Sequence, residues 1–184
     1  MKTILKSLMM AAFFAGLGST AYAQKTATAP ASATILADLT IELDGTQNEI
    51  AFGNLSASTT GPVILDANGL ANSNTGTSTN VARFDLGGAD GSEVTVSFDE
   101  EVLLEGTNNA SNTMTMTSQV VGTALAAEQS AAGIVEIGDT VSLVLNQGGT
   151  RGEYFLWVGG SFPALAGQNV DIYAGTFNIN VEYN

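Results

Sequence analysis

The feature that most constrains this chain is an alternation of apolar and polar residues that recurs in short stretches. It is clearest in residues 175–184, GTFNINVEYN, where Phe177, Ile179, Val181 and Tyr183 alternate with polar residues. A period of two directs successive side chains to opposite faces of a β-strand, so this stretch predicts a strand with one dry and one wet face. Because similar stretches recur along the chain, the sequence predicts an all-β protein.

Short runs of β-branched and apolar residues, separated by clusters of Gly, Asn, Ser, Thr and Asp, indicate the remaining strands. The expected strands are residues 34–43, 50–53, 63–65, 81–86, 93–98, 102–104, 113–119, 140–145, 154–158 and 175–183. Residues 67–80 are polar and are expected to form a long exposed loop, and for residues 123–133 a helix and a loop both stay open. About nine strands with frequent turns predict an antiparallel Greek-key β-sandwich of immunoglobulin-like or pilin-like layout.

Large aromatic residues are expected to fill the core of this sandwich. They are Trp157, Phe84, Phe98, Phe155 and Phe177. In EYFLWVGG both faces of the predicted strand are apolar, which is typical of a strand buried on both sides. A stacking platform for a carbohydrate would need exposed aromatic rings, so Trp157 fits a core position better than a glycan-binding one.

The first residues have the pattern of a secretory signal. Lys2 and Lys6 form a basic start, and the apolar run at residues 8–18 is too short to span a bilayer. Ala21-Tyr22-Ala23 matches the small-x-small site of a signal peptidase. We therefore expect a signal peptide at 1–23, a flexible arm at 24–33 and one domain at 34–184. The protein would be exported to the periplasm, the cell surface or the medium of a Gram-negative-type bacterium.

The charge balance after such a cleavage is strongly acidic. Lys25, Arg83 and Arg151 would remain against 18 acidic residues, a formal charge of −15. This charge repels phosphate backbones and anionic lipid headgroups, so nucleic acids and membrane surfaces are not expected as partners. Divalent cations bound by clustered carboxylates stay possible, and solubility is the simpler explanation.

The chain contains no cysteine and no histidine. Disulfides, thiolate or Ser-His-Asp catalysis and the common zinc sites are therefore absent from its chemistry, and no cofactor motif is present. A domain of this length can bury roughly two-thirds of its unfolded surface, so packing and backbone pairing suffice to hold it.

Carboxylates are the remaining candidates for catalysis. FDEEVLLEG places Asp99, Glu100, Glu101 and Glu105 close together, and Asp99 and Glu101 would share one face of a strand. A solvated strand end explains this pattern more simply, so we expect no enzymatic activity and no catalytic residue.

A calcium site is the second hypothesis for the carboxylates. DLGGADGSE offers Asp85, Asp90, Ser92 and Glu93, and oxygen ligands from loops are what calcium prefers. The stretch lacks the alternating acidic order of an EF-hand loop, and turn chemistry alone explains Asp90-Gly91. Cation binding therefore remains an open alternative with no assigned ligand.

Three stretches fall in a recognisable order: IAFGNL at 50–55, ARFDLGGADGSEVTVSF at 82–98, and a closing run at 154–184. The closing run contains Val-Gly-Gly, Tyr-x-Gly-x-Phe and a terminal Val-x-Tyr. Together they resemble the exported bacterial family catalogued as domain of unknown function 4402. The chain departs from that family's pattern at Asp171-Ile172, where a glycine usually precedes the tyrosine.

The resemblance implies an exported β-sandwich without an assigned activity. Its layout is similar to that of spore-coat-U type and alternative chaperone–usher pilus subunits, in which an extended arm of one subunit fills a groove in the next. The arm at 24–33 alternates small apolar and polar residues in the same way, although it offers only alanines before Ile35.

These observations lead to one expected function and one alternative. We expect a structural or adhesive cell-surface protein, extending to a pilus or filament-type subunit, that self-associates through its strand edges. The alternative is a non-catalytic binding module for a glycan or a divalent cation such as Ca²⁺.

Overall fold

The structure is a computed structural model that describes residues 29–30, 32–146 and 149–184. The expected signal peptide at 1–23 and part of the arm at 24–33 lie outside the described residues. The chain divides into Met1–Thr34 and a compact domain, Ile35–Asn184. All the strands belong to that domain.

Within the described residues the domain contains twelve strands and one 3₁₀ helix. They are β1 (Thr40–Leu43), β2 (Val63–Leu65), β3 (Ala82–Gly88), β4 (Glu93–Phe98), β5 (Glu101–Gly106), β6 (Thr113–Thr123), η1 (Gln129–Ala131), β7 (Gly133–Ile134), β8 (Thr140–Ser142), β9 (Val144–Leu145), β10 (Gly152–Phe162), β11 (Tyr173–Ala174) and β12 (Ile179–Tyr183). Every strand pair is antiparallel. The predicted all-β, antiparallel class is therefore confirmed. No helix in the described part is long and apolar enough to cross a membrane.

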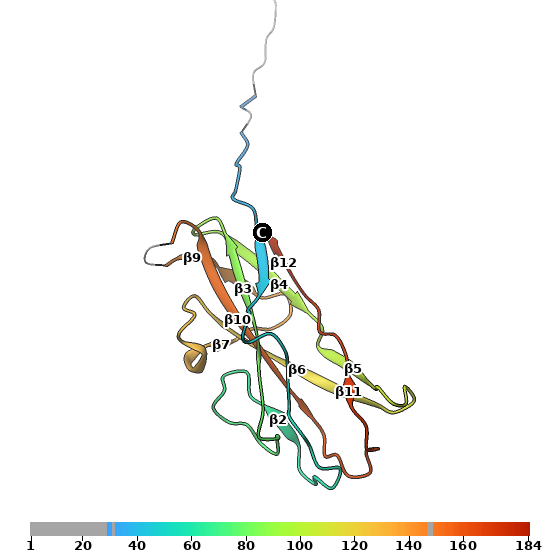
Figure 1. Ribbon diagram of the computed structural model, residues 1–184. Helices are drawn as coiled ribbons and strands as arrows, with labels where there is room; N and C mark the ends of the chain where they lie inside the picture. The colour runs from blue at the N-terminus through green and yellow to red at the C-terminus, as the bar shows by residue number, and fades with distance from the viewer. Residues whose placement is uncertain (1–28, 31, 147–148) are drawn as a thin grey trace, which may run out of the picture. The chain divides into compact units, whose positions relative to one another are not determined.

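The strands form a large sheet and a small one (Figure 1). The large sheet has the order β1-β3-β10-β6-β5-β11, and β2, β7 and β9 add to its middle strands. The small sheet has the order β12-β4-β8. Buried residues of both sheets, such as Val94 and Val96 of β4 with Leu156 and Val158 of β10, share one core cluster. The two sheets thus pack as the layers of a β-sandwich.

Strand β10 is the central element of the large sheet. It pairs with β3 on one edge and with β6 on the other. Leu156 and Val158 belong to the core between the sheets, whereas Phe155 and Trp157 belong to a second cluster. Trp157 has no exposed surface. The prediction that this strand is buried on both faces is therefore confirmed.

The Val-Gly-Gly stretch in β10 has a steric reason. A side chain at Gly159 would overlap the backbone carbonyl oxygen of Leu65, and one at Gly160 would lie within 2.9 Å of Met116. The neighbouring chain segments approach so closely here that only glycine fits.

Strands β4 and β5 are two parts of one run that changes sheets at residues 99–100. β4 belongs to the small sheet and β5 to the large one. The C-terminal segment, residues 168–184, runs alongside β4 and β5, because β12 pairs with β4 and β11 pairs with β5. Its two strands therefore form an edge of each sheet, β11 in the large sheet and β12 in the small one.

Some predicted strands are shorter or broken because a strand needs a partner and alternation alone supplies none. The strand expected from residue 34 begins at Thr40, where pairing with β3 starts. Residues 50–53 contribute a single bridge, from Ala51 to Asn80. The strand expected at 140–145 is interrupted at Leu143, which is fully buried.

Two other expectations need correction, and one open alternative is resolved. The strand at 175–183 is assigned from Ile179 onward, since residues 175–178 pass the bend between the two sheets. Residues 123–133 contain one short 3₁₀ helix, Gln129–Ala131. The expected core residues Phe84, Phe98 and Phe177 are half-buried, in contrast to the buried Phe155 and Trp157.

Candidate functional site

The candidate site is a groove on the inner face of the large sheet. The small sheet covers only part of that face. Beyond it, four side chains of β5 and β6 line an open floor: Val102, Leu104, Met114 and Met116. The floor is apolar because these positions alternate inward along paired strands, with Val102 directly opposite Met116.

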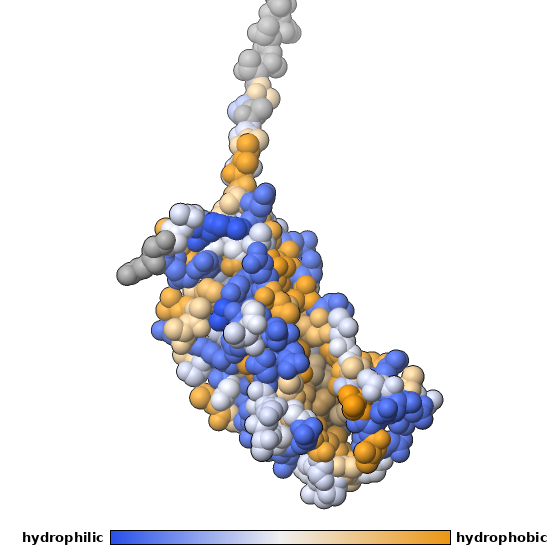
Figure 2. All heavy atoms as spheres, viewed as in Figure 1, coloured by the Kyte–Doolittle hydropathy of each residue, from blue (hydrophilic) through white to orange (hydrophobic). Residues whose placement is uncertain are grey.

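Two chain segments form the walls of the groove. One wall is residues 48–55, and the other is residues 168–177 at the start of the C-terminal segment. The groove has a volume of about 740 Å³. Figure 2 shows apolar residues gathered in a hollow on this face, with hydrophilic residues on either side. On its rim Leu43 is 48% and Ile172 is 68% exposed, so bulky apolar surface faces solvent here.

The C-terminal segment presents an open strand edge to this side of the domain. Its even-numbered residues direct their backbone groups toward the β4–β5 run: the Asp99 N–H donates to the Asn178 carbonyl (3.0 Å), and the Thr107 N–H donates to the Ile172 carbonyl (2.7 Å). In an antiparallel strand, the N–H and C=O groups of the alternate residues point the other way. The odd-numbered residues from 173 to 183 therefore direct theirs away from β4 and β5.

Strand β1 has an open edge as well. Its even-numbered residues face β3, a pattern that the bond from the Asp44 N–H to the Arg83 carbonyl (2.9 Å) continues. The backbone groups of Ile41 and Leu43 accordingly point away from β3. Among the described residues, β1 and β12 are each the outermost strand of their sheet.

The half-buried apolar residues beside these edges indicate where the sandwich is incomplete. Leu39 and Ile41 pack against the same core cluster as Ile179, Val181 and Tyr183, yet all five keep part of their surface exposed. No strand among those described lies between the two edges to cover them. The sandwich is thus open along the side where β1 and the chain end meet.

A carboxylate fixes the C-terminal segment where it crosses from one sheet to the other. Asp99 accepts hydrogen bonds from the backbone N–H (2.9 Å) and the side-chain amide (2.7 Å) of Asn178. Glu100, Glu101 and Glu105 are exposed. Of the carboxylate pair considered for catalysis, Asp99 therefore makes a structural contact, whereas Glu101 faces solvent.

A second carboxylate, Asp171, belongs to no motif in the sequence. It accepts hydrogen bonds from the backbone of Asn108 (3.0 Å), Asn109 (3.2 Å) and Ile172 (2.8 Å) and from the side chain of Asn112 (2.9 Å). The Asn112 amide, followed by the backbone donors, lowers the pKa of Asp171 from 3.8 to about 2. The departure from the family pattern at this position was the only signal in the sequence.

At the other end of the C-terminal segment, two side chains fix residues 37–38. The Tyr183 hydroxyl donates to the Ala37 carbonyl (2.8 Å) and accepts from the Ala89 N–H (2.8 Å). Arg151 donates to the Asp38 carbonyl (2.6 Å). Residues 37–38 are therefore attached to the domain at the point where β12 ends.

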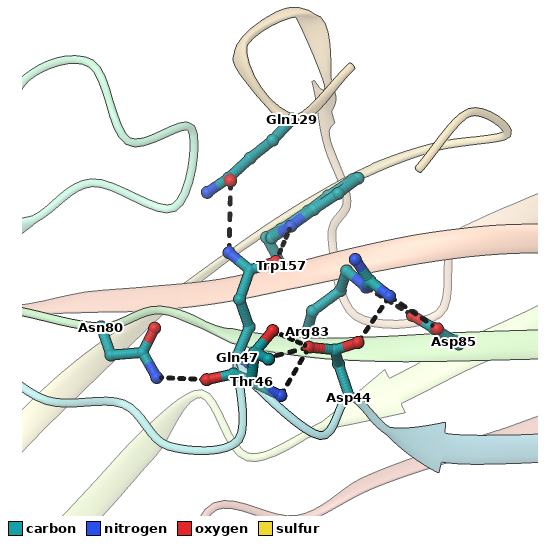
Figure 3. A network of polar contacts seen from close by, with 8 residues as sticks. All are labelled: Asp44, Thr46, Gln47, Asn80, Arg83, Asp85, Gln129 and Trp157. Atoms are coloured by element: carbon teal, nitrogen blue, oxygen red, sulfur yellow. Dashed lines mark hydrogen bonds and ion pairs between the residues drawn. The ribbon is translucent and has the colours of Figure 1, made fainter. Parts of the chain in front are cut away.

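A separate polar network lies apart from the groove floor and serves the fold (Figure 3). The Trp157 indole donates to Gln47 (3.2 Å), and the Gln47 amide donates to Gln129 (3.3 Å). The amide of Gln129 in turn donates to the Ala67 carbonyl (2.7 Å). Trp157 is thus a satisfied core residue and offers no exposed ring for a carbohydrate.

An arginine holds two carboxylates in the same network. Arg83 donates to Asp44 (2.7 Å) and Asp85 (2.7 Å). Asp44 also accepts from the Gln47 and Thr46 N–H groups, and these bonds lower its pKa. These contacts tie the turn after β1 to strand β3.

Two of the residues considered for calcium are already engaged in contacts within the fold. Asp85 is occupied by Arg83, and Asp90 accepts from the Leu145 N–H (2.8 Å). Within residues 29–30, 32–146 and 149–184, no group of three or more acidic side chains is placed to hold a metal ion.

Comparison with known proteins places the groove within a described family. The family model for Domain of unknown function (DUF4402) matches residues 39–183. No curated protein matches the chain. The matched region contains the groove walls, the β4–β5 run and all but the last residue of the C-terminal segment.

Proposed function

The chain belongs to the DUF4402 family, which has no assigned activity, and we propose that it is an exported, non-catalytic structural protein of the cell surface. Its groove takes up an extended chain segment of another molecule, which pairs with the open strand edges and so joins one domain to the next. This mode of binding would make the protein a subunit of a pilus or a similar filament.

The observation that carries the proposal is the combination of an apolar floor with unpaired backbone edges. An extended segment gains main-chain hydrogen bonds from an open edge and gains specificity from pockets for alternate side chains. The odd-numbered residues from 173 to 183 supply such an edge, and Leu104, Met114 and Met116 supply the apolar contacts. An uncovered strand edge beside exposed apolar side chains is a template for pairing.

We propose a non-catalytic protein because four carboxylates already accept hydrogen bonds within the fold. Asp99, Asp171, Asp44 and Asp85 each accept structural hydrogen bonds. The groove floor is formed by aliphatic and thioether side chains. The export part rests on residues 1–23 of the sequence and on a strongly acidic composition.

Sedimentation of the protein made from the full chain tests the proposal. Wild type should form oligomers whose size increases with concentration, and negative-stain images should show linear particles. A protein that stays monomeric at the highest attainable concentration would contradict it.

A matched pair of substitutions connects the assembly to the groove. Leu43→Glu places a charge on the groove rim, and Leu103→Glu places the same charge at a leucine of β5 that is 55% exposed and outside the groove. We expect association to weaken by about tenfold or more for Leu43→Glu, because the partner would have to desolvate the carboxylate, and to stay unchanged for Leu103→Glu. Equal effects of the two substitutions would show that the protein does not assemble through the groove.

A further inference from the structure

The identity of the groove's occupant can be inferred from the segment that precedes β1. We infer that the occupant is residues 24–36 of a second copy of this chain, and that each copy is prevented from filling its own groove by the way residues 37–40 are held. This inference rests on the proposed function, since it names the partner of the same groove.

The large apolar residues of the segment are exposed in their own domain. Ile35 is 96% exposed, and its neighbour Leu36 is 43% exposed. Two adjacent bulky side chains that remain in contact with water are costly. Alternation continues on the N-terminal side of Ile35, where every odd residue from 27 to 33 is alanine. One face of the segment is therefore apolar from residue 27 to residue 35, as a strand facing an apolar groove requires, and Lys25 lies on the same face beyond it.

The segment also has the length that the open edge demands. In an extended conformation residues 24–36 span about 43 Å, and the open edge from Tyr173 to Tyr183 spans about 36 Å. The segment is long enough to follow the whole edge while residue 37 remains attached to its own domain.

The charge of the segment is complementary to that of the domain. The segment carries Lys25 and no acidic residue, whereas all 18 acidic residues of the chain lie at 38–184 beside only Arg83 and Arg151. The contact between the segment and the domain of another copy therefore brings no like charges together, although two whole copies, each strongly acidic, repel each other at long range.

The backbone before β1 keeps the segment from its own groove. To enter it, the chain would have to reverse between Ala37 and Thr40, and the two-residue turns that match the twist of paired strands require a positive φ in at least one central residue. Asn74 is the only non-glycine residue of the described part with a positive φ, so Asp38 and Leu39 do not form such a turn.

The contacts of residues 37–38 hold this unreversed state. The Ala37 and Asp38 carbonyls accept from Tyr183 and Arg151, and Arg151 also donates to the Gly87 carbonyl (2.9 Å) on β3. A reversal would break these bonds. Ile35 and Leu36 are thus kept from their own groove and are available to the groove of another copy.

The test compares two isoleucines in the full-length protein. Ile35→Asp alters the segment, and Ile134→Asp alters an isoleucine of β7 that is 70% exposed and outside the groove lining. Both side chains are solvent-exposed in the single domain, so at concentrations too low for association both variants should melt at the wild-type temperature. We expect Ile35→Asp to weaken association by about tenfold or more, because the apolar contact is lost, and Ile134→Asp to leave it unchanged.

Cross-linking locates the contact, which is straightforward because the chain has no cysteine. A mixture of Ile35→Cys and Leu43→Cys proteins, treated with a short bis-maleimide, should give cross-linked dimers, whereas Ile35→Cys with Ile134→Cys should give far fewer. In a chain carrying both Ile35→Cys and Leu43→Cys, cross-links should join different molecules.

The outcomes separate this inference from the proposed function. If wild type assembles and Leu43→Glu prevents it while Ile35→Asp does not, the groove keeps its function and the inferred occupant is wrong. A cross-link within single molecules would overturn the inference by showing that the segment fills its own groove. If wild type does not assemble, both fail.

Discussion

Two side chains hold the two ends of the C-terminal segment, Tyr183 through backbone groups and Asp171 through both backbone and side-chain donors. Asp171 collects the donors of the loop at 107–112 before the segment begins its run along β5. Tyr183 bridges Ala37 and Ala89 where the segment ends. Between them, the open edge is held along both sheets. Asp171 and Tyr183 therefore shape the proposed groove by holding the open strand edge of the C-terminal segment in place.

The carboxylate at the start of the segment should make stability depend on pH in the acid range. Because the folded pKa of Asp171 is lowered to about 2 from 3.8, the ionised form is favoured by folding. Its contribution to stability is present above pH 4 and is lost as the pH falls toward 2. Asp171→Asn should therefore melt at a lower temperature than wild type at pH 7, with the difference shrinking at pH 2.

Thermal melts monitored by circular dichroism at the two pH values measure this effect. Glu182→Gln, which changes an exposed carboxylate of β12, serves as the control and should show no such convergence with wild type. A constant difference between wild type and Asp171→Asn from pH 7 to pH 2 would contradict the account.

What could be predicted for single residues followed from local chemistry. Trp157 was correctly placed in the core because both faces of its strand are apolar. The role of Asp171 could not be predicted, since its donors come from residues 108–112, far away in sequence. The pairing of β5 with β11 is what brings these donors to Asp171 in the folded domain.

At the scale of elements, alternation identified strands reliably where both edges are paired. The strand expected at 93–98 was found with the same bounds, and β10 was found longer than expected because it is paired on both edges. The strand expected from residue 34 was wrong in its first six residues, which alternate but pair with no strand of the described part. Periodicity describes a side chain's environment, whereas strand assignment also needs a hydrogen-bonded partner.

Strands β10 and β2 are in close contact at Gly159. Gly159→Ala would place a methyl group against the Leu65 carbonyl, so we expect a loss of about 1–3 kcal/mol in the free energy of unfolding, as for other overpacked positions. Gly133→Ala is the matched control, because a Cβ there meets no atom within 4 Å. Urea denaturation of both variants measures the difference. Equal midpoints would show that β2 can move away from the added methyl group without a loss in the free energy of unfolding.

The whole domain is a sandwich whose small sheet is too short to cover the large one. The groove results from that mismatch and from the absence, among the described strands, of one that joins β1 to the chain end. The sequence predicted the sandwich but not the groove, because counting strands does not reveal which edges remain unpaired. The family match at 39–183 includes the groove and the open edges, but it assigns them no function.

Amide hydrogen exchange along the C-terminal segment shows whether the groove accepts a strand. In the monomer, the N–H groups of Tyr173, Ile179 and Val181 point away from β4 and β5 and should exchange fast, whereas those of Asn178 and Asn180 face the β4–β5 run and should be protected. On self-association, the odd-numbered amides should become protected while the even-numbered ones change little. If the oligomer forms and the odd-numbered amides still exchange at the monomer's rate, the groove does not accept a strand and the account is wrong.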